Sequence, residues 1–210
     1  YSFKRNNSFS AVAEECRAVR EKAGLLDLSS FAKFDIEGPD AETFLNRLCA
    51  NRIPKKTRGI SLVHLLTDLG GIECEGTVAR LSENQFYFLS AAVAEIHDED
   101  WLVQQCPPGE QVQVKNVTDD YGVLVLTGPK SREILSQITD ADLSNEAFPW
   151  LRCRQITVSG IPVRALRVSY VGELGWELHH PMNQMQTLYK QLHQAGKAYG
   201  LMDFGTYAVN

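Results

Sequence analysis

Two features that define specialised protein classes are missing from this chain of 210 residues. No apolar run approaches the roughly 18 residues that a membrane-spanning helix needs. Basic residues do not dominate either, since 26 acidic side chains outnumber 21 basic ones and give a net charge of −5. Nucleic-acid binding normally requires a basic face. We therefore expect a globular protein with neither membrane nor nucleic-acid partners.

Common catalytic and metal-binding motifs are also missing. The sequence has no Gly-x-Gly-x-x-Gly, no phosphate-binding loop and no nucleophile elbow, so nucleotide and acyl-transfer chemistry have no recognisable site. The adjacent His179 and His180 lie on a predicted strand, where neighbours face opposite ways and do not readily share a metal. We expect no metal site and five reduced, mostly buried thiols in a reducing compartment. The thiols belong to Cys16, Cys49, Cys74, Cys106 and Cys153.

An ordinary globular composition is what the sequence does have, with 44% hydrophobic and 22% charged residues. A chain of this length buries about 70% of its unfolded surface, enough for one large domain or two small ones. Apolar periodicity and Gly or Pro breaks predict alternating helices and strands. Helices are expected at 11–23, 39–49, 92–105, after Gly128-Pro129 and at 183–199, and strands at 31–37, 60–67, 72–81, 85–90, 122–127, 166–171 and 176–180.

One pattern occurs twice, as GPDAETFLNRL at 38–48 and GPKSREILSQI at 128–138. Each copy begins with Gly-Pro, which ends a strand, and continues with the apolar spacing of a helix. A Gly-containing hairpin turn follows each copy further along the chain. We interpret the chain as a linker and first helix (1–24) followed by two α+β halves (25–110 and 111–210). Chance recurrence of a common turn is the alternative.

The predicted strand at 72–81 places two carboxylates side by side. Alternation puts Glu73, Glu75 and Thr77 on one face. The other face carries Ile72 and Cys74 and suits a core. Two interpretations stay open for the acidic face: a solvated surface, or a lined cavity in which a carboxylate acts as a base.

The second hairpin has a similar character. Tyr170 ends one predicted strand, and Glu177 lies on the next, facing away from Trp176 and Leu178. Glycines at this density let a backbone or a flat ligand approach closely, although a tight turn with a surface glutamate explains the pattern equally well. A nearby basic cluster indicates ordinary surface charge. It consists of Arg152, Arg154, Arg164 and Arg167.

Five segments resemble, in the same order, the folate-binding, aminomethyltransferase-like region of the dimethylglycine dehydrogenase and sarcosine dehydrogenase family. The segments are LDLSSFAKF (26–34), LGGIECE (69–75), DADLSNEAFP (140–149), SYVGELGWEL (169–178) and DFGTYAVN (203–210). The last one resembles the dimethylglycine dehydrogenase branch in particular. The resemblance implies two pseudo-repeated α+β units of the aminomethyltransferase folate-binding fold, without its final β-rich domain.

The resemblance also implies tetrahydrofolate as the cofactor and assigns a catalytic carboxylate. Glu75 matches the residue that takes a proton from the folate amine or stabilises the developing cation. Aspartate stands at this position in aminomethyltransferases and sarcosine dehydrogenases, whereas dimethylglycine dehydrogenases of animals carry glutamate. Because a misplacement of about 1 Å can cost about 100-fold in rate, the longer side chain affects catalytic strength. Glu73 is a further candidate, as a charged neighbour of Glu75.

Four more residues match folate-binding positions of the family. Glu177 matches the glutamate that accepts the pterin ring N–H and exocyclic amine, an arrangement that suits a bidentate carboxylate. Tyr170 matches the tyrosine beside the folate, where its ring can pack and its hydroxyl can hydrogen-bond. Leu89 and Ser90 match the strand end that meets the other edge of the pterin.

The function implied is that of a folate-dependent one-carbon transferase module. In the family, an upstream FAD domain of the same polypeptide oxidises an N-methyl amine such as dimethylglycine or sarcosine, and the folate region forms methylenetetrahydrofolate. The expected location is the bacterial cytoplasm or the mitochondrial matrix. Two alternatives stay open: a non-catalytic module that kept the fold, like the regulatory subunit of pyruvate dehydrogenase phosphatase, and a stand-alone folate-dependent demethylase. The opening YSFKR (1–5), typical of a linker, counts against the second.

Overall fold

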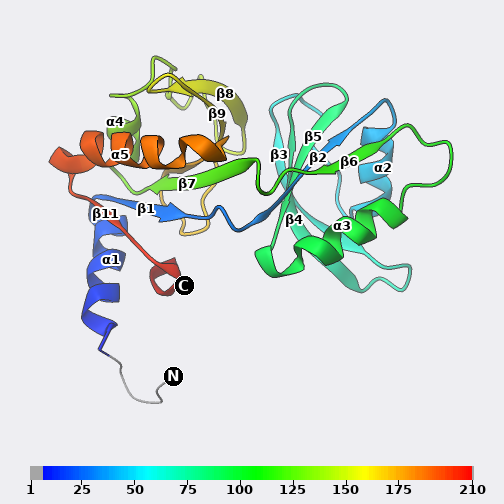
Figure 1. The fold of residues 1–210 in the computed structure, drawn as a ribbon, viewed down its shortest axis with the longest axis horizontal. Helices are drawn as coiled ribbons and strands as arrows, with labels where there is room; N and C mark the ends of the chain where they lie inside the picture. Colours follow the sequence, from blue (N-terminus) through cyan, green and yellow to red (C-terminus); the bar gives the residue numbers. More distant parts are fainter. Residues whose placement is uncertain (1–6, 210) are drawn as a thin grey trace. The chain divides into compact units, whose positions relative to one another are not determined.

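The computed structural model describes residues 7–209 and contains two compact units (Figure 1). The predicted linker at 1–5 and the last residue of the 203–210 segment lie outside the described residues. We call the first unit the middle unit; it comprises Ser29–Tyr121 and Leu151–Arg154. We call the second the terminal unit; of the described residues it comprises 7–28, Gly122–Trp150 and 155–209.

The middle unit is built on an antiparallel sheet of five strands in the order β3-β4-β5-β2-β6. Its apolar core joins alternate strand residues to the buried face of α2, where Phe44 and Leu45 are fully buried. The strands are β2 (Ala32–Glu37), β3 (Ile60–Leu66), β4 (Ile72–Arg80), β5 (Gln85–Ser90) and β6 (Gln113–Asn116). The helices are α2 (Ala41–Leu48) and α3 (Glu95–Gln104), the latter preceded by the 3-10 turn Ala92–Ala94.

The terminal unit contains a mixed sheet of six strands in the order β11-β1-β7-β10-β9-β8. Its core packs the sheet against α4 and α5, through side chains such as Ile134, Leu188 and Leu192. The strands are β1 (Ala23–Asp27), β7 (Tyr121–Thr127), β8 (Cys153–Val158), β9 (Ile161–Leu166), β10 (Gly175–Pro181) and β11 (Leu201–Asp203). The helices are α1 (Phe9–Glu21), α4 (Ser131–Leu135), α5 (Met185–Gly196) and α6 (Thr206–Val209), and α5 continues into the 3-10 turn Lys197–Tyr199.

The repeated Gly-Pro pattern corresponds to the same local structure in both units. Gly38 and Gly128 have φ angles of 138° and 113°, which a residue with a side chain rarely adopts. A Cβ at Gly38 would collide with the carbonyl oxygen of Gln111, and one at Gly128 would lie 2.8 Å from Ala23 Cα. In each unit the glycine follows a strand and precedes a helix. Both units combine helices with a sheet that is antiparallel or mixed, which confirms the predicted α+β fold class.

Other elements differ from the expectations. The strand expected at 166–171 is absent, because β9 ends at Leu166 and the amide of Val168 folds back to the Leu166 carbonyl at 3.1 Å. The predicted halves at 25–110 and 111–210 differ from the compact units, since β1 pairs with β7 and β11 and carries the first segment into the terminal unit. No helix between residues 7 and 209 is long and apolar enough to cross a membrane.

Candidate functional site

The strand β4 carries Glu75 on the face opposite the core. Cys74 and Val78 are buried, whereas the side chain of Glu75 is 63% exposed. Glu75 lies directly across from His64 on β3, and its Oε2 is 2.8 Å from His64 Nε2. A carboxylate only accepts hydrogen bonds, so this contact requires a proton on Nε2. The expectation that Ile72 faces the core is wrong: the ladder is irregular between Leu65 and Leu66, and Ile72 is 66% exposed.

Glu73 belongs to a separate network that reaches into α3. Its Oε1 lies 2.9 Å from His97 Nε2, and His97 Nδ1 lies 3.0 Å from Asp98 Oδ1. The other oxygen of buried Asp98 accepts a hydrogen bond from the Cys74 thiol at 3.2 Å. The hydrogen bond to Asp98 and the charges of Asp98 and Glu73 raise the pKa of His97. Each of the two β4 carboxylates therefore has its own histidine partner.

Leu89 and Ser90 lie at the end of β5, directly beside β4. Leu89 is in register with Thr77, and Ser90 is in register with Gly76. Both residues are largely buried, with exposed fractions of 8% and 3%. Four of the predicted site residues therefore lie on neighbouring strands of the middle unit: Glu73 and Glu75 on β4, and Leu89 and Ser90 on β5. The Ser90 side chain contacts Cys74 on the core face, opposite Glu75.

The other two predicted residues belong to the terminal unit. Glu177 lies on β10 between Trp176 and Leu178, both fully buried, and faces away from them as predicted. Its side chain is 21% exposed, and its Oε2 lies 3.2 Å from Nε2 of the buried His179. Tyr170 is 81% exposed in the loop that joins β9 to β10.

Arg167, in the same loop, is a structural residue, and the expectation that it belongs to an ordinary surface cluster is wrong. It is 8% exposed and donates to the carbonyl oxygen of Phe148 and to Asn145 Oδ1. Its guanidinium lies 5.7 Å from the ring of Trp176, and that of Arg132 lies 5.9 Å from the same ring. Burial and the charge of Arg132 lower the pKa of Arg167. These contacts fix the chain between β9 and Tyr170.

His180 supplies a pH-dependent contribution to the stability of the terminal unit. It is fully buried and donates from Nδ1 to the Leu178 carbonyl at 2.9 Å. Burial, opposed by that hydrogen bond, lowers its pKa below the usual 6.5. Below about pH 6.5 the unfolded state therefore binds a proton that the folded state does not. As the pH decreases through this range, the free energy of unfolding falls by up to about 1.4 kcal/mol per pH unit.

We expect amide exchange in β10 to accelerate between about pH 7.5 and 5.5, after correction for the intrinsic rates. The matched variant His180→Leu fills the same buried position without a titrating group, so its profile should be flatter. Identical profiles for the two proteins would contradict this role of His180.

The cysteines behave as the sequence predicts. All five are free thiols; Cys49, Cys74 and Cys153 are buried, and Cys16 and Cys106 are partly exposed. Burial raises the pKa of Cys49 to about 12. Burial, together with the hydrogen bond to Asp98, also raises the pKa of Cys74. Between residues 7 and 209, no cluster of three or more potential ligands could hold a metal ion.

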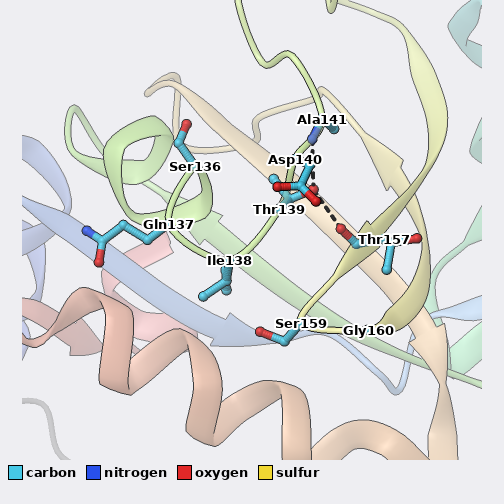
Figure 2. Close-up of a pocket in the computed structure, with 9 residues that line it drawn as sticks. All are labelled: Ser136, Gln137, Ile138, Thr139, Asp140, Ala141, Thr157, Ser159 and Gly160. Carbon is cyan, nitrogen blue, oxygen red and sulfur yellow. Dashed lines mark hydrogen bonds between the residues drawn. The ribbon is translucent and has the colours of Figure 1, made fainter.

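A cavity of about 460 Å³ opens in the terminal unit beside the turn between β8 and β9 (Figure 2). Two hydrogen bonds, drawn as dashed lines in Figure 2, join backbone and hydroxyl groups: Thr139 Oγ1 donates to the Thr157 carbonyl at 2.6 Å and accepts from the Ala141 amide at 3.2 Å. Its wall has a single ionisable side chain, Asp140, and none of the predicted site residues. The lining residues are Ser136, Gln137, Ile138, Thr139, Asp140, Ala141, Thr157, Ser159 and Gly160.

The sequence analysis did not identify the histidines that contact Glu73, Glu75 and Glu177. His64 could have been found by counting outward from the turn at 68–71, which places it opposite Glu75. His179 follows Glu177 by two residues, so strand periodicity puts both on one face. His97 comes from a helix after β5, and no local pattern links it to Glu73.

Comparison with known proteins supplies a family. The chain matches the GCVT N-terminal domain model over residues 1–210. It is 41% identical over 210 residues to mitochondrial dimethylglycine dehydrogenase of Mus musculus and 33% identical over 224 residues to mitochondrial sarcosine dehydrogenase of Homo sapiens. These alignments include all of this chain and 24% of each relative, so the chain spans about a quarter of their length.

The solved structures agree in fold. The glycine cleavage system aminomethyltransferase T from Bartonella henselae matches with a TM-score of 0.81 and 25% identity, over 94% of this chain and 52% of that one. Heterotetrameric sarcosine oxidase from Corynebacterium sp. U-96 matches with a TM-score of 0.69 and 18% identity, over 94% of this chain and 97% of that one. The family model, the relatives and the shared fold agree, and the chain belongs to the GCVT N-terminal domain family.

Proposed function

We propose that this chain is the tetrahydrofolate-binding part of a larger flavoenzyme. It captures the one-carbon unit released by oxidative demethylation of an N-methyl amine, such as dimethylglycine or sarcosine, and yields methylenetetrahydrofolate. The observation that carries the proposal is the 41% identity to dimethylglycine dehydrogenase over all 210 residues. FAD and the choice of amine belong to an upstream domain of the parent polypeptide. The compartment, bacterial cytoplasm or mitochondrial matrix, stays a prediction.

The donor and acceptor groups of the terminal unit suit a pterin ring. Glu177 is held at the surface of a rigid strand, with its side chain 21% exposed. Its carboxylate can accept two parallel N–H donors from one edge of a flat ring. The exposed ring of Tyr170 offers an aromatic face and a hydroxyl. Leu89 and Ser90, at the end of β5, belong to the middle unit, and their proposed contact with the ring rests on the family resemblance alone.

Glu75 is proposed as the base of the reaction. Tetrahydrofolate, when bound, supplies the amine that attacks the electrophilic one-carbon unit. Glu75 Oε2 accepts a hydrogen bond from His64, which leaves Oε1 to take the proton that the amine loses. Glu73 is engaged by His97 and adds negative charge to the same strand.

The test of the binding assignment is Glu177→Gln in the full-length parent protein. Glutamine keeps the shape but replaces one acceptor oxygen with a donor, which opposes the ring N–H groups. We expect calorimetric titration with 5-formyltetrahydrofolate, a stable reduced folate, to show affinity roughly 10- to 100-fold lower than that of the wild type. A matched control is Glu173→Gln, because Glu173 lies in the preceding loop and pairs with Arg20 at 2.6 Å. Equal affinity of the wild type and Glu177→Gln would refute the assignment.

A further inference from the structure

The face of β10 that carries Glu177 also carries a buried histidine. His179 lies two residues further along the strand and is 2% exposed, whereas the Glu177 side chain is 21% exposed. Their Nε2 and Oε2 atoms are 3.2 Å apart. Since a carboxylate only accepts, the imidazole must donate from Nε2. The buried imidazole of His179 therefore donates a hydrogen bond to the partly exposed carboxylate of Glu177.

The backbone on both sides of Glu177 is held in place. Glu177 and His179 are in register with Leu166 and Arg164 on β9. His180 points to the opposite face, where it is fully buried and donates to the Leu178 carbonyl. The sheet thus fixes the backbone of His179, and burial restricts its side chain, so the position of the Nε2 donor is well defined.

Glu177 itself has freedom that this donor removes. A glutamate side chain has three rotatable bonds, and fixing it at a partly exposed site has an entropic cost. A hydrogen bond from an already ordered imidazole lowers that cost before any ligand binds. It also occupies one lone pair of Oε2 and leaves Oε1 and the second lone pair of Oε2 for other donors.

We propose that His179 is a positioning residue for ligand recognition at Glu177. It donates from Nε2 to Oε2 and presents the carboxylate edge to the paired N–H donors of a flat pterin-type ring. This inference rests on the proposed function, because it needs Glu177 to contact the ligand.

The experiment is a double-mutant cycle in the full-length parent protein, titrated with 5-formyltetrahydrofolate. His179→Leu and His179→Met fill the buried space without a donor, and His179→Gln keeps an N–H near the position of Nε2. We expect the apolar variants to lower the affinity about 10-fold and the glutamine variant to stay within about threefold of the wild type. In the Glu177→Gln background, the apolar variants should change the affinity by less than about twofold. Thermal unfolding of each variant identifies those that keep the wild-type midpoint.

Each outcome decides between the two proposals. Wild-type affinity in a folded apolar variant overturns the positioning role alone. An equal loss of affinity with and without the Glu177 carboxylate also overturns it, because the effect then comes from the fold. Unchanged affinity in Glu177→Gln alone overturns both. Rescue by His179→Gln, together with coupling to Glu177, supports the positioning role.

Discussion

Replacing Glu75 with glutamine in the full-length parent protein is expected to slow methylenetetrahydrofolate formation by about 100-fold or more. The substitution keeps the size of the side chain and its place on β4, opposite His64. Glutamine has no group that can take a proton from the folate amine at neutral pH. Folate affinity should change by less than about threefold, because Glu177, and not Glu75, is the proposed binding carboxylate.

The measurement is the partition of product between methylenetetrahydrofolate and free formaldehyde for each N-methyl amine oxidised. Flavin reduction serves as an internal reference, since that chemistry belongs to a domain outside this chain. Glu83→Gln is a suitable control, because Glu83 is an exposed glutamate of the same unit. An unchanged partition in Glu75→Gln would show that this carboxylate is not the base.

Trp176→Ala is expected to destabilise the terminal unit by about 3–5 kcal/mol. Trp176 is fully buried, its ring centroid lies 6.2 Å from that of Phe148, and the guanidinium groups of Arg132 and Arg167 lie against it. Its removal leaves a cavity and takes the aromatic face away from two guanidinium groups, of which that of Arg167 is buried. Because Trp176 precedes Glu177, the loss also loosens the strand that carries the binding carboxylate.

Hydrogen exchange of the β9 and β10 amides in the full-length protein measures this effect locally. Exchange should accelerate by about 100-fold or more, as the expected free-energy change requires. Trp150→Ala is the matched control, because Trp150 belongs to the same unit and is 52% exposed. We expect the control to change stability by less than about 0.5 kcal/mol. Similar exchange in both variants would contradict the structural role of Trp176.

Local features of the fold could be predicted because their causes are local. The Gly-Pro pattern predicted the turns at Gly38 and Gly128, where the backbone geometry disfavours any residue with a side chain. Strand alternation predicted that Glu177 faces away from Trp176 and that Glu75 faces away from Cys74. In each case the information lies within a few neighbouring residues.

Features that depend on distant parts of the chain could not be predicted. The pairing of β1 with β7 and β11 joins segments about a hundred or more residues apart, and it determines which unit the first segment enters. The burial of Arg167 depends on Asn145 and the Phe148 carbonyl, so its sequence neighbours indicated only a basic surface. The exposure of Ile72 follows from an irregular register between β3 and β4, where Glu73 is skipped, and strict alternation does not anticipate this.

The most direct test of the account is calorimetric titration of the wild-type full-length protein with 5-formyltetrahydrofolate. We predict saturable binding that Glu177→Gln weakens and that Glu75→Gln largely keeps. Absence of binding to the intact wild-type protein would contradict the proposed folate-binding function and favour a non-catalytic module that has kept the fold.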